Sequence, residues 1–188
     1  MTRTRTTVRL LSAFLLVGIV PLGCGGDGGN KNVVAPEPCI AFAPASAPAA
    51  GLVVTRTVAS TCESITLDVV VREVTALFAA SFTVEFDPAV VAYTGFSTAG
   101  SVLSSDGAQV EMLVQEQSGK VTIGLTRLAV DTGVFVPGEG KLGSLILRKV
   151  LDPSTTALSY SDATLLGNET PPVAKPGIEW KGGTLTVQ

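Results

Sequence analysis

Carboxylates and cysteines are the side chains that could do chemistry in this sequence, because its 188 residues include no histidine. Histidine is the commonest general base near neutral pH, so most hydrolytic mechanisms would lack one of their catalytic residues here. Glycosidases use two carboxyl groups about 5 to 9 Å apart. The acid pairs considered for that role are Glu85/Asp87, Glu111/Glu116 and Asp162/Glu169. A turn explains Asp87 better, since Pro88 follows it, and the acidic residues lack metal-ligand spacing. We predict no catalytic residue, no metal site and no cofactor.

The three cysteines divide between two roles. Cys39 and Cys62 form an even pair, and in an oxidising compartment a disulfide between them is the economical hypothesis. Cys24 ends the stretch of residues 20–24 (VPLGC), with Pro21 where leucine is usual. This stretch resembles the lipobox of bacterial lipoproteins, in which the cysteine is acylated and becomes the new N-terminus. We therefore expect lipidation at Cys24.

The first 23 residues are typical of an export signal. Arg3, Arg5 and Arg9 form a positive region ahead of an apolar core at residues 10–20, which is short for a membrane-spanning helix. We predict that residues 1–23 are a lipoprotein-type signal peptide and that the exported domain is lipid-anchored to a bacterial membrane on its extracytoplasmic side. The alternative is a plain signal peptide with an incidental cysteine.

Residues 24–50 are rich in Gly, Pro and Ala, and the prolines at positions 36, 38, 44 and 48 disfavour regular secondary structure. We predict a flexible tether there. The whole chain is 46% hydrophobic and 15% charged, a balance that favours one folded domain over disorder. The formal net charge of -3 offers no basic surface for nucleic acid, which we exclude as a partner.

From residue 51 onward, short apolar runs alternate with polar positions and are separated by Gly, Pro, Asp and Ser. Alternation with a period of two is typical of half-buried strands. The predicted strands are residues 52–59, 65–72, 80–86, 90–96, 109–117, 120–128, 143–150, 157–166 and 184–187. We therefore predict that residues 51–188 form an all-β domain, an antiparallel β-sandwich with jelly-roll topology and about nine strands.

Three blocks of this region carry a family likeness. They are residues 80–96 (ASFTVEFDPAVVAYTGF), residues 138–145 (GEGKLGSL) and residues 182–187 (GGTLTV). The first is a hydrophobic strand that ends in a Phe-Asp-Pro turn, the second a small polar turn before an apolar strand, and the third a closing strand. In these features residues 51–188 resemble cohesin domains. The resemblance implies a non-catalytic β-sandwich that binds the calcium-loaded helical dockerin of a partner enzyme on one flat sheet face.

The alternation identifies candidate residues for such a face. Leu113 is apolar among side chains that otherwise follow the polar, outward pattern, and a central apolar anchor with a polar rim is typical of protein interfaces. The predicted partner-binding residues are Thr83, Glu85, Glu111, Leu113, Gln115, Thr122 and Thr126.

Two other functions stay open. Cohesin folds resemble several cellulose-binding modules, so a polysaccharide is an alternative ligand, but aromatic residues make up only 5% of the chain. Trp180 and Tyr160 are the candidate rings, and Trp180 is the one we predict for sugar stacking. The third alternative is a structural or adhesive surface lipoprotein, since a fold does not fix a function.

Overall fold

The computed structural model describes residues 39–45 and 52–188. The predicted signal peptide, Cys24 and most of the predicted tether lie outside the described residues. No helix in these two ranges is long and apolar enough to cross a membrane. The elements are β1 (Ile40–Pro44), β2 (Leu52–Ser60), β3 (Ser64–Glu85), β4 (Val91–Ser97), η1 (Val102–Ser104), β5 (Gln109–Gln117), β6 (Lys120–Leu128), β7 (Val134–Lys149), β8 (Ser154–Gly167), β9 (Glu179–Lys181) and β10 (Gly183–Val187).

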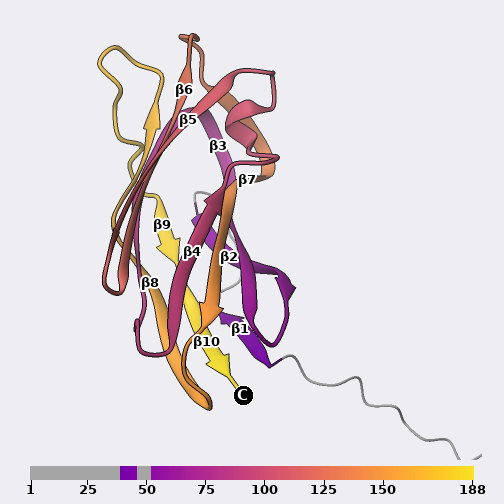
Figure 1. Cartoon of the computed structure of the whole chain (residues 1–188). Helices are drawn as coiled ribbons and strands as arrows, with labels where there is room; N and C mark the ends of the chain where they lie inside the picture. Colours follow the sequence, from indigo (N-terminus) through magenta and orange to yellow (C-terminus); the bar gives the residue numbers. More distant parts are fainter. Residues whose placement is uncertain (1–38, 46–51) are drawn as a thin grey trace, which may run out of the picture. The chain divides into compact units, whose positions relative to one another are not determined.

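Strand β3 holds the two layers of the domain together. It is 22 residues long; its first part pairs with β2 and β7, and its last part pairs with β6 and β8. The strands therefore form one layer in the order β9-β2-β3-β7-β4 and a second in the order β1-β10-β8-β3-β6-β5 (Figure 1). Between the two parts the pairing with β7 shifts register, at Glu73 and Ala76 with φ of 51° and 49°.

The space between the layers is filled by the inward side chains of the alternating strands. Leu67 and Phe82 on β3 and Leu145 on β7 are fully buried, and the ring of Phe82 meets that of Phe96 edge to face at 6.1 Å. The burial follows the predicted period of two, because successive side chains of a strand point to opposite faces. The predicted all-β sandwich is confirmed, with ten strands among the described residues in place of about nine. Their pairs are antiparallel, as predicted, except that of β2 with β9, which is parallel.

The N-terminal strand β1 was not predicted, because its five residues lie in the proline-rich stretch that we assigned to the tether. Ile40 is fully buried and pairs with Val187 at the end of β10. Pro44 stands at the other end of β1, on the edge of its sheet, where a residue without an N–H is tolerated. Part of the predicted tether, residues 40–44, therefore belongs to the sandwich.

Arg127 is a charged side chain inside the domain. The alternation that turns Thr126 outward on β6 turns Arg127 inward, and its side chain is fully buried. Its Nη1 donates to the carbonyl oxygen of Leu103 at 2.7 Å, and its Nη2 donates to Asp106. That hydrogen bond, more than any other contact, lowers the pKa of Asp106 below its ordinary value. The guanidinium therefore holds η1 and the loop after it against β6.

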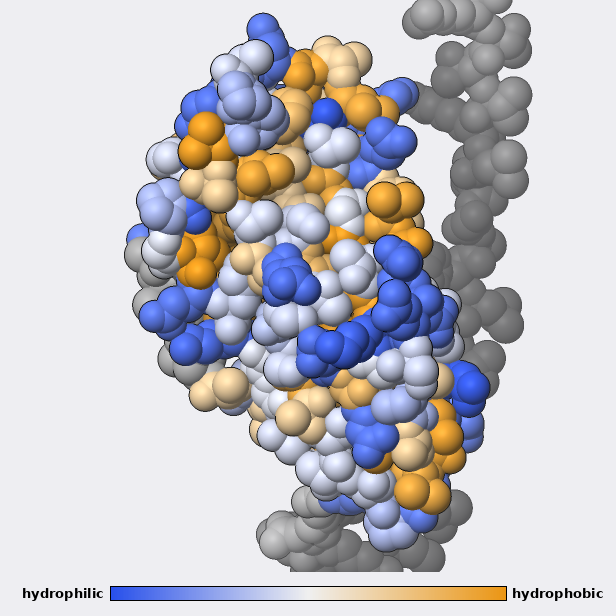
Figure 2. Space-filling model, turned by 90° about the vertical axis from the view of Figure 1, so that its left-hand side faces the viewer, coloured by the Kyte–Doolittle hydropathy of each residue, from blue (hydrophilic) through white to orange (hydrophobic). Residues whose placement is uncertain are grey.

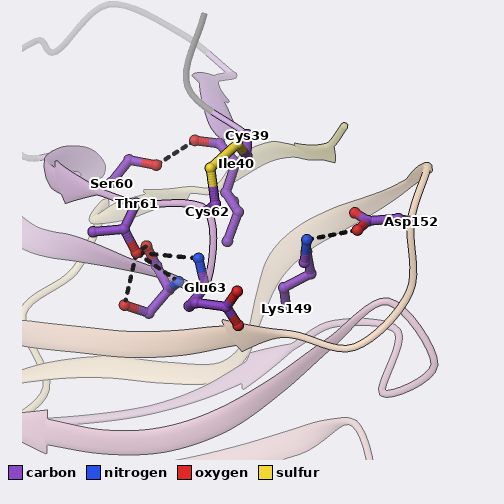
Figure 3. The surroundings of a disulfide bond; sticks show 9 residues. Cys39, Ile40, Ser60, Thr61, Cys62, Glu63, Lys149 and Asp152 are labelled. Atoms are coloured by element: carbon purple, nitrogen blue, oxygen red, sulfur yellow. Dashed lines mark hydrogen bonds and ion pairs between the residues drawn. A yellow bond between two sulfur atoms is a disulfide. The ribbon is translucent and has the colours of Figure 1, made fainter.

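A disulfide joins Cys39 to Cys62, with their Cα atoms 4.6 Å apart (Figure 3). Beside it, Ser60 Oγ donates a hydrogen bond to the carbonyl oxygen of Ile40, and the Gln188 N–H donates to the carbonyl oxygen of Cys39. The predicted pairing is confirmed. It fits an exported protein, because disulfides persist in oxidising compartments, and it fixes the start of β1 to the turn before β3.

Replacing Cys39 and Cys62 together by serine should lower the free energy of unfolding by about 2 to 4 kcal/mol, since the bridge closes a loop in the unfolded chain. Urea denaturation of the unreduced protein and of the double variant measures the difference. Adding a reductant should bring the unsubstituted protein down to the variant's stability and leave the variant unchanged. Equal stabilities without reductant would contradict a contribution from the bridge.

Candidate functional site

The seven predicted partner-binding residues lie together on the outer face of the layer β8-β3-β6-β5. The pairing of the four strands arranges this face in rows across the sheet. From β8 to β5 the rows are Leu166–Ala79–Thr126–Glu111, Thr164–Ser81–Gly124–Leu113, Ser161–Thr83–Thr122–Gln115 and Ser159–Glu85–Lys120–Gln117. We call this surface the four-row face. Every predicted residue falls in one of its rows, so the alternation placed them correctly on one side of the sheet.

The two rows that begin with Leu166 and Thr164 border an apolar hollow of about 460 Å³. Its lining includes Ala79, Leu113, Gly124, Leu166 and Pro172. Leu113 is 75% exposed, the highest fraction among the large apolar side chains of the described residues. A Cβ atom built on Gly124 would meet only Leu113, at 3.9 Å and beyond, so the missing side chain leaves the hollow open.

The other two rows are polar. Glu85 Oε1 accepts hydrogen bonds from Ser161 Oγ at 2.6 Å and from Lys120 Nζ at 2.9 Å. Thr83 and Thr122 are joined by their hydroxyl oxygens at 2.9 Å. Thr83 is only 6% exposed because its neighbours cover it, so it contributes less surface than its outward position suggested. In Figure 2 hydrophobic residues gather in the upper half of this side of the molecule and a hydrophilic band crosses its middle.

The hydrogen bond from Ser161, followed by that from Lys120, lowers the pKa of Glu85 below its ordinary value. Both donors favour the charged carboxylate, because they bind the anion more strongly than the neutral acid. Glu85 therefore keeps its negative charge at pH values where an ordinary glutamate begins to protonate, and the polar half of the four-row face keeps one charge pattern across the neutral and mildly acidic range.

Replacing Ser161 by alanine should raise the pKa of Glu85 toward its ordinary value, because the serine hydroxyl is the largest cause of the lowering. Replacing Lys120 by glutamine should also raise the pKa of Glu85. Carboxyl carbon NMR measured through a pH titration reports both shifts. Ser159→Ala is the matched control, since Ser159 lies directly opposite Glu85 on β8. A rise in the pKa of Glu85 in the control equal to that in Ser161→Ala would contradict this assignment.

Trp180, the residue predicted for sugar stacking, packs against the core. Its ring centroid lies 5.1 Å from that of Phe82 and 5.4 Å from that of Tyr160, and its side chain is half-buried. The hydroxyl of Tyr160 shares a hydrogen bond of 2.6 Å with Thr55. These contacts bury part of the Trp180 ring inside the domain, where a sugar cannot stack on it. Sugar stacking at Trp180 stays a prediction. The described residues do not offer a row of exposed aromatic rings beside it.

Two of the acidic residues considered for catalysis, Glu85 and Asp87, have other contacts. Glu85 is paired with Lys120, and Asp87 Oδ1 accepts a hydrogen bond of 2.9 Å from the Ala89 N–H, as the predicted turn requires. In the part of the chain that the structure describes, no group of three or more Cys, Asp or Glu side chains could hold a metal ion.

Several residues of the four-row face and of the hollow beside it were missed by sequence reasoning. Leu166 and Ser161 come from β8, and Pro172 follows it; all three meet residues of β3, β5 or β6 that lie far away in the sequence. Alternation tells which side of a strand a residue faces, but it does not tell which strand lies next to which. Gly124 carried a signal, since a glycine inside a strand often marks the close approach of another chain.

Comparison with known proteins identifies the family. The model of the cohesin domain matches residues 51–172. The chain therefore belongs to the cohesin family, as the resemblance of its strand and turn blocks implied. No curated protein matches the chain.

Solved structures that this chain resembles include several cohesins. The solution structure of CaCohA2 from Clostridium acetobutylicum is 14% identical, with 73% of this chain and 90% of that chain covered and a TM-score of 0.58. The second type II cohesin module of the adaptor scaffoldin ScaA from Acetivibrio cellulolyticus is 15% identical, with 77% and 87% covered and a TM-score of 0.55. The third cohesin of ScaC from Acetivibrio cellulolyticus, solved in complex with the ScaB dockerin, is 12% identical, with 66% and 88% covered and a TM-score of 0.53. At these identities the likeness establishes the fold.

Proposed function

We propose that this domain is a non-catalytic binding module that takes a helical, dockerin-like protein on the four-row face. The observation that carries the proposal is the exposed Leu113 beside an apolar hollow, with hydrogen-bonding side chains in the rows next to it on the same surface. An apolar centre inside a polar rim is the usual anatomy of a specific protein interface. The ScaC cohesin, which shares the fold, was solved with a dockerin bound.

The hollow gives the partner its apolar anchor. Leu113 stands at the rim and Gly124 opens the floor, so an aliphatic or aromatic side chain of the partner can enter beside Leu113. Removing a leucine side chain from water is worth about 1.5 to 3 kcal/mol. The flat sheet around the hollow suits a helix, which presents apolar residues along one stripe.

The polar rows orient the partner. Ser161 and Lys120 both donate to Glu85 Oε1, which fixes the carboxylate and leaves Oε2 for a donor on the partner. Gln115 lies exposed in the next row, with an amide that can donate and accept. Because Glu85 and Lys120 are already paired, they add specificity more than affinity to a complex.

Leu113→Asp should weaken the binding of calcium-loaded dockerin domains by at least about tenfold, because the charge would be buried beside an apolar surface. Gly124→Val should have the same effect by filling the hollow from its floor. Val58→Asp is the matched control, since Val58 is 58% exposed on β2 and lies outside the four-row face. Isothermal titration against a panel of dockerin domains measures the three affinities, with circular dichroism as the check on folding.

Two results would contradict the protein-binding proposal. One is unchanged dockerin affinity in both Leu113→Asp and Gly124→Val. The other is retention on insoluble cellulose that is lost in Trp180→Ala and kept in Leu113→Asp, which would favour the polysaccharide alternative. Binding to neither ligand class would leave the structural surface lipoprotein as the better description.

The proposal includes export and membrane anchoring through a lipid on Cys24. The stretch that ends in Cys24 and the disulfide between Cys39 and Cys62 support it, since one resembles a lipobox and the other fits an oxidising compartment. Radiolabelled palmitate should label the protein in bacterial cells, and Cys24→Ser should abolish the label. An unlabelled wild-type protein would reduce the leader to a plain signal peptide.

A further inference from the structure

The edge strand β5 has an open hydrogen-bonding side. Among the described strands it pairs with β6 alone, over nine residues in unbroken register from Gln109 to Gln117. The hairpin closes on Gln117 and Lys120, which are joined by a two-residue turn. In an antiparallel pair, hydrogen-bonded and non-hydrogen-bonded positions alternate, so the odd-numbered residues of β5 bond to β6. The N–H and C=O groups of Val110, Met112, Val114 and Glu116 therefore point away from β6 toward the open edge.

β5 also lacks three of the features that usually protect an edge strand, namely shortness, proline and bulges, although it carries the charged Glu111 and Glu116. Among the described strands, the other edges have them: β1 has five residues and ends in Pro44, β9 has three residues, and β4 shifts register between Tyr93 and Gly95. β5 instead exposes apolar side chains on both of its faces, with Leu113 at 75% and Met112 at 41%. Such an edge is a template for another strand.

The sequence of β5 is complementary to itself. When two copies run antiparallel about a two-fold axis at Leu113, Met112 lies opposite Val114 and Val110 lies opposite Glu116. These are the residues whose N–H and C=O groups face the open edge. In this register the groups of one copy form hydrogen bonds with those of the other. Leu113 then meets its own copy at a non-hydrogen-bonded position, where opposite side chains come closest.

The charges of β5 agree with this register. The two acidic residues of the strand are Glu111 and Glu116. Glu111 lies opposite Gln115 of the second copy, an amide that can donate to it, and Glu116 lies opposite Val110. Shifting the centre to Glu111 would set that carboxylate against its own copy, which is unfavourable for directly opposite side chains. The register centred on Leu113 therefore combines apolar contact with the absence of facing like charges.

We propose that two copies of this chain associate through β5, antiparallel and centred on Leu113, so that the two β8-β3-β6-β5 layers join into one continuous sheet. The contact is small and the association is weak, because it uses one strand edge on each copy. It sets Leu113 and the apolar hollows of the two copies side by side across the two-fold axis. The association needs no dockerin and does not rest on the proposed function.

Two variants with opposite charges at position 115 test the register. Gln115→Lys should tighten self-association about 3- to 10-fold, because the new cation lies opposite Glu111 of the second copy in two symmetric contacts. Gln115→Glu should weaken it by a similar factor, since the new anion lies opposite the same carboxylate. Sedimentation equilibrium of the purified full chain without a partner, at concentrations up to about 1 mM, measures the three dissociation constants. Circular dichroism confirms that both variants keep the fold of the parent.

Amide hydrogen exchange locates the contact. As the protein concentration rises, the amides of Met112 and Val114 should become slower to exchange, while those of Leu113 and Gln115, already bonded to β6, should not change. A chain that stays monomeric throughout the concentration range overturns the proposal. A dimer whose stability changes in the same direction in both Gln115 variants, or which protects amides elsewhere, also overturns it.

Discussion

The continuity of β3 is the constraint on which the rest of the domain depends. One strand gives its first part to the layer with β2 and β7 and its last part to the layer with β6 and β8, so the two layers are connected through the same backbone. Phe82 and Val84 lock the last part into the core with fully buried side chains. Because side chains alternate along a strand, that packing also fixes Thr83 and Glu85 on the opposite side, in the polar half of the four-row face.

The four-row face is therefore a product of the core. Its apolar and polar halves follow from the pairing of the strands. Gly124 and Leu113 share a row in the apolar half, and Lys120 and Ser161 lie in the polar half near the end of β3. The hollow exists because two small residues, Ala79 and Gly124, lie in adjacent rows, while the larger Leu113 stands at the rim. A surface fixed by core packing in this way is already formed in the chain alone, and a preorganised surface loses less conformational freedom on binding.

The sequence predicted the sandwich and the side of the sheet on which the candidate residues lie. It did not predict the features that depend on contacts between residues far apart in the sequence. The hairpin of β5 and β6 was predicted to its last residue, since alternation and a two-residue turn are local signals. The continuity of β3 was missed because Glu73 and Ala76 interrupt the alternation between its two parts. β1 was missed because prolines surround it, and its place depends on pairing with β10 at the other end of the chain. Ser161 joins the four-row face, and Pro172 joins the lining of its hollow, through tertiary contacts alone.

The disulfide determines how the domain receives tension. A pull on the chain ahead of Cys39 passes through the sulfur atoms to Cys62, two residues before β3 begins, and bypasses β1 and β2. From there the backbone continues as a strand that is hydrogen-bonded on both sides for most of its length. A force along the axis of this strand loads its ladders in shear and does not open them one bond at a time. The same strand ends at Glu85 in the polar half of the four-row face, so one continuous stretch of backbone connects Cys62 to that face.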